Sequence, residues 1–356
     1  MNVNIVLSFA FDYFLPSLLI WAFISNNADM RVATKYINIS FGFVILYGLI
    51  THFTHVNPVV DFFKYNNPFP NSKIVFADFS EKIRGNVTGR LQAYYPNAIL
   101  YGGVVALHLV FCLLYLKPDK GLAFKKSKLM TIITILACIL SLFLINSRSS
   151  LVCLFASLFV IILLGRLKQS LQIVFLGAST TLIVLTLFSE LLADYLPTVN
   201  NIFTLGKEGN VSGSSLEMRY TQLLSALQIY SKKPVLGWGF NYIQYLLEAG
   251  RTGDLLGAES IVFQVLISGG ILGAAAYLFM FSAAYSKLLS RYRKVNRYTG
   301  MIGVSLFTGY LAFALLTGDQ GLMKFMLIYL ALIFKQLDIE YSARRQAPKS
   351  LSNLSN

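Results

Sequence analysis

The chain has little charge. Asp, Glu, Lys and Arg make up 13% of its 356 residues, whereas soluble domains carry about 25%. Hydrophobic residues make up 56%. This balance excludes a string of soluble domains and favours a membrane protein.

Cysteine is scarce as well. Cys112, Cys138 and Cys153 all lie within apolar stretches and form no CxxC pair. The sequence therefore excludes a disulfide framework, and we interpret the three thiols as small residues that face lipid or the protein core. The glycine-rich loops of nucleotide-binding proteins are also missing, because neither GxxxxGK[ST] nor a dinucleotide fingerprint occurs.

The residues for a metal centre are missing too. His52, His55 and His108 do not have metal-ligand spacing, and no compact cluster of acidic residues occurs. His108 lies inside an apolar stretch, where we expect a packed polar side chain. No metal and no cofactor are therefore expected.

Long apolar runs are what the chain has instead. They are continuous, and they are longer than the alternating stretches of about ten residues that form a β-barrel span. A transmembrane helix needs about 20 such residues. We predict an all-α fold, a polytopic α-helical integral membrane protein in one membrane domain over residues 1–356, with about nine transmembrane helices; counts of eight to ten stay open. The expected spans are 5–24, 36–52, 97–116, 129–146, 150–165, 170–189, 259–285, 299–317 and 321–337.

The connecting segments differ sharply in charge. One alternating set holds 18 of the 30 Lys and Arg residues but only 4 of the 16 Asp and Glu residues. Basic segments stay in the cytoplasm, so this set predicts a cytoplasmic C-terminus and, with nine spans, an external N-terminus. The net charge of +14 is therefore a topology signal, and no nucleic-acid partner is expected. The basic segments are 25–35, 117–128, 165–169, 286–297 and 335–356.

Two segments on the other side are longer than ordinary connections. They cover residues 53–96 and 190–258, and they separate the helical regions 97–189 and 259–337; residues 338–356 form a cytoplasmic tail. Loops longer than about 15 residues are usually functional or disordered. We expect the active site between the two external loops.

The second long loop contains helical periodicity. A helix is predicted from Leu216 to about residue 231, and its apolar side chains define an amphipathic helix at the outer surface. Lys232-Lys233-Pro234 ends it, and Gly237 and Gly239 flank Trp238 in a predicted tight turn. The apolar positions are Leu216, Tyr220, Leu223, Leu224, Leu227 and Tyr230.

Four of the arginines on the external side are candidates for binding an anion, because the positive-inside rule does not account for them. They are Arg84, Arg90, Arg148 and Arg219. Guanidinium stays charged and binds phosphate through two parallel hydrogen bonds. Any one of them could instead contact lipid headgroups. Arg148 is the hardest to explain in that way, since it lies in a short Ser-rich hairpin between two apolar spans.

Glu259 opens the long apolar run after the second loop. A carboxylate at a helix N-terminus is stabilised by the helix dipole, which is one interpretation. The other is a general base at the membrane surface. Farther along, the small residues Gly269, Gly270 and Gly273 predict close helix packing. Asp319 is expected to be a polar turn residue.

The order of these features resembles the O-antigen ligase/polymerase superfamily of bacterial membrane glycosyltransferases. The resemblance rests on the Ser147-Arg148-Ser149 hairpin, Arg219, Pro234-Val-Leu-Gly237-Trp-Gly239 and Ala258-Glu259-Ser260, with a further arginine before a membrane helix at Arg84 or Arg90. It covers roughly residues 80–335.

The resemblance implies a function. Such enzymes act on undecaprenyl-diphosphate-linked oligosaccharides at the outer face of the bacterial inner membrane, without a metal. By analogy, Arg148 and Arg219 would bind the diphosphate, assisted by Arg84 or Arg90. Arg219 would stabilise the leaving group, and Glu259 would deprotonate the acceptor hydroxyl.

Three functions stay in competition. Ligases of this superfamily carry a histidine near the Glu259 position, so the glutamate favours a repeat-unit polymerase of the GT-C-like type, for O-antigen, capsule or another polysaccharide. A ligase is the first alternative, and a transporter or flippase is the second. Membrane lipid is an expected partner, as are a chain-length regulator and a flippase of the same pathway.

Overall fold

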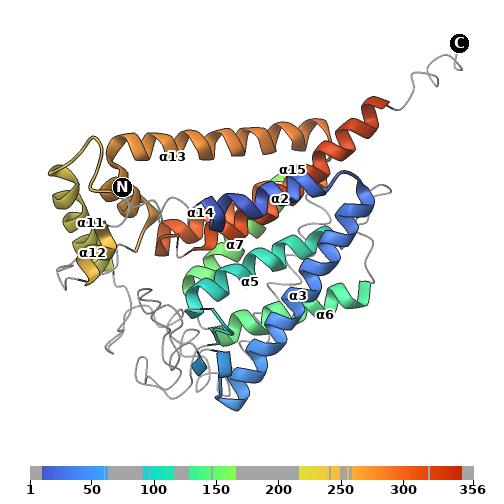
Figure 1. Ribbon diagram of the computed structural model, residues 1–356, viewed down its shortest axis with the longest axis horizontal. Coiled ribbons are helices and arrows are strands. Elements are labelled where there is room, and N and C mark those ends of the chain that lie inside the picture. Colours follow the sequence, from blue (N-terminus) through green and yellow to red (C-terminus); the bar gives the residue numbers. More distant parts are fainter. Residues whose placement is uncertain are drawn as a thin grey trace, which may run out of the picture.

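The structure of the chain is a computed structural model. It describes residues 10–59, 61–62, 91–95, 97–115, 128–145, 147–165, 216–239, 242–248, 255, 259–319 and 321–346. Within these residues the chain is helical throughout and has no strand, which confirms the predicted all-α fold (Figure 1). The helices are η1 (Ala10–Phe14), α2 (Leu15–Phe23), α3 (Asn27–Thr54), α5 (Ala98–Cys112), η2 (Leu113–Tyr115), α6 (Lys128–Ile145), α7 (Arg148–Leu164), α11 (Leu216–Ser231), α12 (Tyr242–Glu248), α13 (Ile261–Lys294), α14 (Arg297–Thr317) and α15 (Leu322–Gln346).

Most helix bounds follow the apolar runs closely. α13 and α15 continue to Lys294 and Gln346, past the expected ends at residues 285 and 337. α3 begins at Asn27, although its apolar run begins near residue 36. The cause is a capping box: the Asn26 side chain accepts hydrogen bonds from the N–H groups of Ala28 and Asp29, and the Asp29 carboxylate accepts one from the Asn26 N–H. The predicted span 170–189 lies outside the described residues.

Three described helices are long and apolar enough to cross a membrane: α3, α13 and α14. The apolar parts of α5, α6 and α7 are shorter, at 10–17 residues. The outer surface of the bundle is itself apolar, since Phe43, Phe159 and Phe279 are 68%, 60% and 78% exposed. Large exposed apolar surface on a helical bundle is typical of a protein that sits in lipid.

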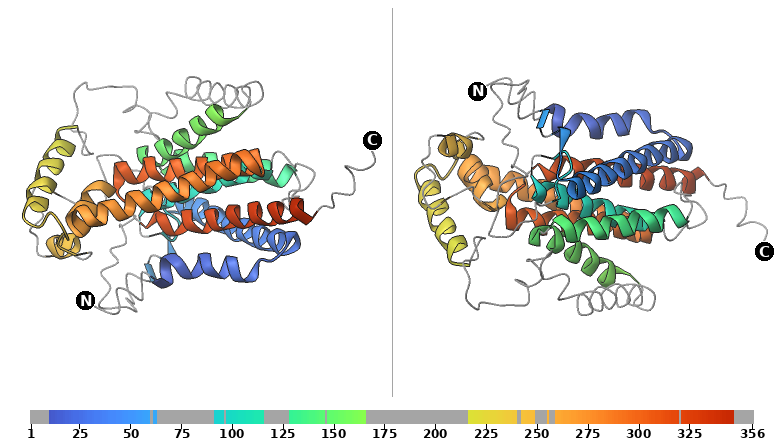
Figure 2. Two further views of the ribbon diagram at one scale, coloured as in Figure 1. Left: turned by 90° about the horizontal axis from the view of Figure 1, so that it is seen from above. Right: turned by 90° about the horizontal axis from the view of Figure 1, so that it is seen from below.

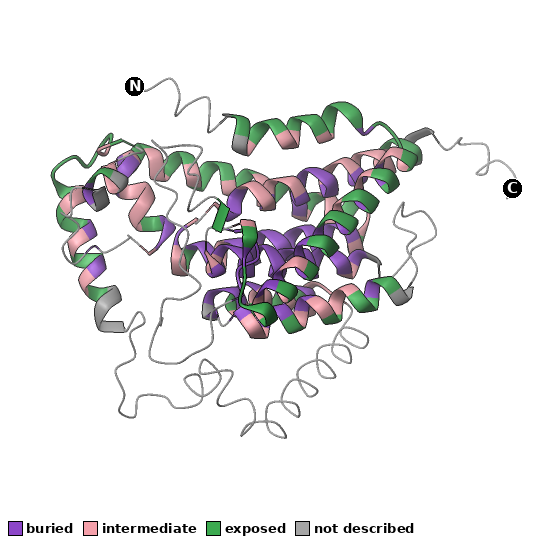
Figure 3. Cartoon of the chain, turned by 60° about the horizontal axis from the view of Figure 1, so that its bottom comes forward, coloured by how far each residue is buried: buried purple, intermediate pink, exposed green. Residues whose placement is uncertain are grey.

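The core lies around α5 and α14, which are buried along most of their length (Figure 3). α7, α13 and α15 pack against α14, and α6 and α7 pack against α5. Cys112, Cys138 and Cys153 are buried free thiols, as the sequence predicts. His108 is also buried, stacks on Phe41 and pairs its Nδ1 with the Tyr329 hydroxyl at 2.8 Å, so it is a packed polar residue.

The described parts of the basic segments lie at one end of the bundle. The α2–α3 turn, the end of α5, the start of α6, the α13–α14 turn and the end of α15 lie together there (Figures 1 and 2). Contacts tie this end together: the Arg291 guanidinium pairs with the Asp338 carboxylate at 2.8 Å, and the Asn296 amide donates to the Glu340 carboxylate at 3.0 Å. The start of α13 and the α14–α15 turn lie at the opposite end.

α13 is interrupted by a junction with the Gly-Trp-Gly segment. Gly270 has φ 60° and ψ −158°, a conformation that breaks the helical ladder. The N–H groups of Ile271 and Leu272 donate to the carbonyls of Pro234 and Val235 at 2.8 and 3.3 Å. In return, the Ile267 and Ser268 carbonyls accept from the N–H groups of Trp238 and Gly239, at 2.8 and 2.9 Å. We call residues 234–239 and 267–272 together the glycine junction.

The glycine junction replaces two helical hydrogen bonds with four. In a regular helix the N–H groups of residues 271 and 272 would donate to the carbonyls of residues 267 and 268. The inserted segment takes up all four of these groups, so the interruption leaves none of them without a partner. The predicted tight turn is present, with φ 69° at Gly237 and 97° at Gly239.

Close approach at the glycine junction leaves no room for side chains. A Cβ atom on Gly270 would lie 2.4 Å from the Val235 carbonyl oxygen, and one on Gly237 would lie 2.6 Å from the Ser268 carbonyl. At Gly269, by contrast, a Cβ atom would have nothing within 4 Å. The prediction that these glycines serve packing between long helices is therefore wrong: Gly270 admits the backbone of the preceding loop.

The glycine junction fixes α11 and α12 against the first part of α13. A small apolar cluster covers the contact and contains Ala226, Leu246, Leu255 and Ile267. The Trp238 ring adds a hydrogen bond from Nε1 to the Ile229 carbonyl at 3.0 Å and stacks on Tyr242 with 4.5 Å between ring centroids. Figure 2 shows α11 and α12 together at the end of the bundle where α13 begins.

We predict that Gly270→Ala and Gly237→Ala destabilise the protein, because each forces a Cβ atom into a backbone and into a positive φ. The backbone strain alone is on the order of 1–3 kcal/mol. Gly269→Ala is the matched control and should change stability by less than about 1 kcal/mol. Thermal unfolding of the purified proteins in detergent measures this. Equal unfolding midpoints for the Gly270→Ala and Gly269→Ala variants would contradict the close backbone contact at the glycine junction.

Candidate active site

The Ser-Arg hairpin lies between α6 and α7, and its serines are buried. Ser147 precedes Arg148, the first residue of α7. The Ser150 hydroxyl donates to the Ser147 hydroxyl at 2.9 Å, and the Ser147 and Ser149 hydroxyls lie 3.1 Å apart. A Cβ atom on Gly102 of α5 would lie 2.1 Å from the Ser150 Oγ, so α5 holds the hairpin tightly. Arg148 therefore stands at a rigid helix N-terminus, where the helix dipole favours an anion.

A second anchored segment lies beside this hairpin. The N–H group of Leu91 donates to the Leu144 carbonyl near the end of α6 at 3.4 Å, and the Asn57 amide donates to the Ala93 carbonyl at 2.6 Å. Leu91 directly follows Arg90 in the sequence. Arg90 itself and Arg84 lie outside the described residues.

The helix that carries Arg219 is present as predicted, but the face it buries is not the apolar one. Tyr220 is 61% exposed, and Leu223, Leu224 and Leu227 are exposed as well. The buried residues of α11 are Gln222 and Ala226, which face the first part of α13. Arg219 lies three positions before Gln222, in the first turn of the helix. The exposed apolar face suits a membrane surface.

Glu259 lies just outside α13. The helix begins at Ile261, and Ser260 is its N-cap, with the hydroxyl accepting from the Val262 N–H at 3.3 Å. Capping is therefore supplied by Ser260, and Glu259 precedes the helix by two residues. The Glu259 side chain is half-buried, and no ion pair joins it to any residue that the structure describes. A half-buried carboxylate in this position is open to a substrate.

Asp319 belongs to the same end of the bundle, and the sequence reasoning missed it. Its carboxylate accepts hydrogen bonds from the hydroxyls of Tyr310 and Tyr13 at 3.0 and 3.2 Å and from the Met323 N–H at 2.8 Å. Its own N–H donates to the side-chain oxygen of Gln264, one turn into α13, at 3.4 Å. Asp319 is therefore the polar residue of the α14–α15 turn, as predicted, and its contacts with η1, α14 and α15 are what the sequence did not indicate. The available signal was that Asp319 is the only acidic residue between Glu259 and Asp338.

Burial changes the acidity of this carboxyl group. Removal from water raises the pKa of Asp319 above its ordinary value of 3.8, while the hydrogen bonds from Met323, Tyr310 and Tyr13 act in the opposite direction. The higher pKa makes a proton more stable on Asp319 than on an exposed aspartate. Asp319 is thus a carboxyl group that takes up a proton more readily than an exposed aspartate, and it lies close to the start of α13.

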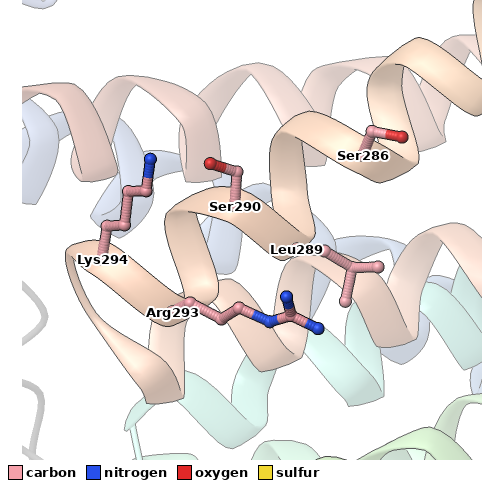
Figure 4. Close-up of a pocket in the computed structure, with 5 residues that line it drawn as sticks. All are labelled: Ser286, Leu289, Ser290, Arg293 and Lys294. Carbon is pink, nitrogen blue, oxygen red and sulfur yellow. The ribbon is translucent and has the colours of Figure 1, made fainter.

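A hollow of about 410 Å³ lies elsewhere, at the far end of α13 (Figure 4). It is lined by Ser286, Leu289, Ser290, Arg293 and Lys294, and it contains none of the predicted site residues. Within the described ranges, no group of three or more His, Cys, Asp and Glu side chains is arranged to hold a metal ion.

The backbone thus brings several of the predicted residues to one end of the bundle. Arg148 begins α7, Arg219 is in the first turn of α11 and Glu259 precedes α13. These features define a class: a helical protein with the apolar outer surface of an integral membrane protein, in which three of the predicted residues lie at helix starts.

Comparison with known proteins supports one family. A family model described as O-antigen ligase matches residues 132–278, from α6 into α13. The match includes the Ser-Arg hairpin, α11, the glycine junction and Glu259. This part of the chain is therefore similar to the O-antigen ligase/polymerase superfamily, which the motifs of the sequence resemble. No curated protein matches the chain.

We predict that Asp319 makes stability depend on pH. Because its pKa is higher in the folded chain than in the unfolded one, its contribution is complete below about pH 4 and is lost as the pH rises through the folded pKa. Asp319→Asn should remove this loss, since the amide carries no charge, whereas Asp319→Ala should lose about 1–3 kcal/mol through the three broken hydrogen bonds. Unfolding midpoints between pH 4 and pH 8 measure both effects. If the unfolding midpoints of wild type and Asp319→Asn change with pH in the same way, the raised pKa of Asp319 is contradicted.

Proposed function

We propose that the protein polymerises undecaprenyl-diphosphate-linked oligosaccharide repeat units, with the diphosphate lipid as leaving group. The match of residues 132–278 to a family model described as O-antigen ligase supports a membrane glycosyltransferase-like enzyme. The observation that carries the finer proposal is the grouping of Arg148, Arg219 and Glu259 at one end of the bundle, two cationic residues and a carboxylate. We place this end at the outer face of the bacterial cytoplasmic membrane, because the basic segments lie at the other.

The reaction follows from these groups. The acceptor hydroxyl attacks the anomeric carbon of the donor sugar while Glu259 takes the hydroxyl proton. The bond between that carbon and the diphosphate oxygen breaks, and undecaprenyl diphosphate leaves with the electron pair. Arg148 and Arg219, with Arg84 or Arg90, stabilise the charge that develops on it. Direct attack inverts the configuration at the anomeric carbon.

Two supports come from the described backbone. The N-terminus of α7 carries the partial positive charge of a helix end in addition to Arg148, so it favours a phosphate. Arg219 lies in the first turn of α11, a helix that packs against α13, which is the helix that Glu259 precedes. The apolar face of α11 remains exposed for the lipid carrier.

A ligase of the same superfamily is the alternative, because the matching family model is described as O-antigen ligase. A gel of surface and lipid-linked glycans from cells with and without the gene separates the two. Polymerase function predicts that deletion leaves single repeat units and that the gene restores the ladder. Long polymer that persists on its carrier lipid after deletion would make the protein a ligase, and an unchanged gel would contradict both.

We predict that Arg148→Ala and Arg219→Ala each lower the polymerisation rate by about 10²–10³-fold, since each removes a cation from the leaving group. Glu259→Gln should lower it by about 10²–10⁴-fold, because it keeps the shape and removes the base. Arg293→Ala, an exposed arginine at the far end of α13, is the control and should retain full activity. The rate is measured as ladder formation by membranes with equal amounts of inserted protein. Full activity in both arginine variants would refute the phosphate-binding role.

A further inference from the structure

Among the described residues, Gln222 is the only side chain with two buried polar atoms that lack a hydrogen-bond partner. Gln222 on α11 is 0% exposed. Both polar atoms of its amide, Oε1 and Nε2, are buried, and neither has a hydrogen-bond partner in the structure. Buried polar groups of native proteins are hydrogen-bonded in the large majority of cases, so an amide with both ends unpaired requires an explanation.

The position of Gln222 on its helix limits the explanations. One turn later on the same face, Ala226 enters the apolar cluster with Leu246, Leu255 and Ile267. Three residues earlier on that face is Arg219. Gln222 therefore lies where the inner face of α11 changes from an apolar contact to a cationic position.

An apolar side chain would serve packing better at this position. A buried donor and acceptor that lose their water without gaining a partner destabilise the fold, and an apolar side chain of similar size would not. Gln228 on the same helix has the same side chain, but it is exposed and stays in contact with water. The difference singles out Gln222 as a residue that is retained for a ligand.

The chemistry of the amide identifies the class of ligand. A carboxamide presents an acceptor and a donor side by side. A phosphate or carboxylate offers acceptors only, so it would satisfy the NH₂ group and leave the carbonyl oxygen unpaired. Sugar hydroxyls donate and accept, so two neighbouring hydroxyls satisfy both ends of the amide at once.

We propose that Gln222 binds hydroxyl groups of the donor sugar that is linked to the diphosphate. This rests on the proposed function, in which Arg219, one turn away on the same face, binds the diphosphate itself. The pair would then recognise the two chemical parts of the donor at their junction, with the cation on the phosphate and the amide on the sugar. Gln222 is thereby assigned as a residue that distinguishes the glycosylated lipid from the bare carrier.

We predict that Gln222→Leu weakens binding of the glycosylated lipid by about 10- to 100-fold, as expected for the loss of two hydrogen bonds to substrate. Its affinity for undecaprenyl diphosphate without sugar should stay within about twofold, and its unfolding temperature should be equal to or higher than that of wild type. The probes are lipid-linked repeat units isolated from the deletion strain and undecaprenyl diphosphate, each titrated onto the purified full chain in detergent. Gln228→Leu is the matched control and should change neither affinity.

The outcomes separate this inference from the proposed function. Unchanged affinity of Gln222→Leu for the glycosylated lipid, or an equal loss for both lipids, would overturn the sugar contact. Gln222→Met, with an unbranched side chain of similar length, repeats the test if the leucine variant unfolds early. Arg219→Ala should weaken binding of both lipids. If it weakens binding of neither, the phosphate-binding role fails while the Gln222 result stands. Wild type that binds neither lipid would refute both.

Discussion

The exchange of backbone hydrogen bonds at the glycine junction is the constraint on which the rest of the site depends. α13 gives up two of its own hydrogen bonds, and the segment from Pro234 to Gly239 takes their place with four. This is possible only because Gly237 and Gly270 lack side chains where the two backbones meet. Backbone hydrogen bonds therefore hold this loop against α13, the helix that begins two residues after Glu259. These hydrogen bonds are formed within the protein and do not depend on lipid.

Two groups of polar residues lie near the first turns of α13. On one side, α11 carries Arg219 and the unpaired amide of Gln222. On the other, Asp319 holds the α14–α15 turn to Gln264 and gathers two tyrosine hydroxyls around its carboxylate. A reaction in which a diphosphate leaves needs cations that are already in place before charge develops. Rigid helix ends, such as that of α7, and a fastened loop supply such positions better than free loops do.

Hydropathy predicts the helices well because an apolar run long enough to span a bilayer is a local property of the chain. The run expected at 129–146 is the helix Lys128–Ile145, and the end of α11 and the turn at Gly237 and Gly239 also follow local signals. The insertion at Gly270 was missed because its partner segment lies some thirty residues earlier, and no local pattern reports such pairing. Periodicity also predicts the apolar face of α11 that is exposed, but it does not report that Gln222 and Ala226 form the buried side. Asp319 was missed because its role depends on Tyr13, which is distant in sequence.

The most direct measurement is reconstitution of the purified protein in liposomes that contain undecaprenyl-diphosphate-linked repeat units, with EDTA present, followed by mass analysis of the lipid-linked products. Our account predicts glycans that grow in steps of one repeat unit, with one undecaprenyl diphosphate released for each linkage formed. Donor that is bound but never elongated, or that is transferred only when a separate lipid acceptor is added, would contradict it.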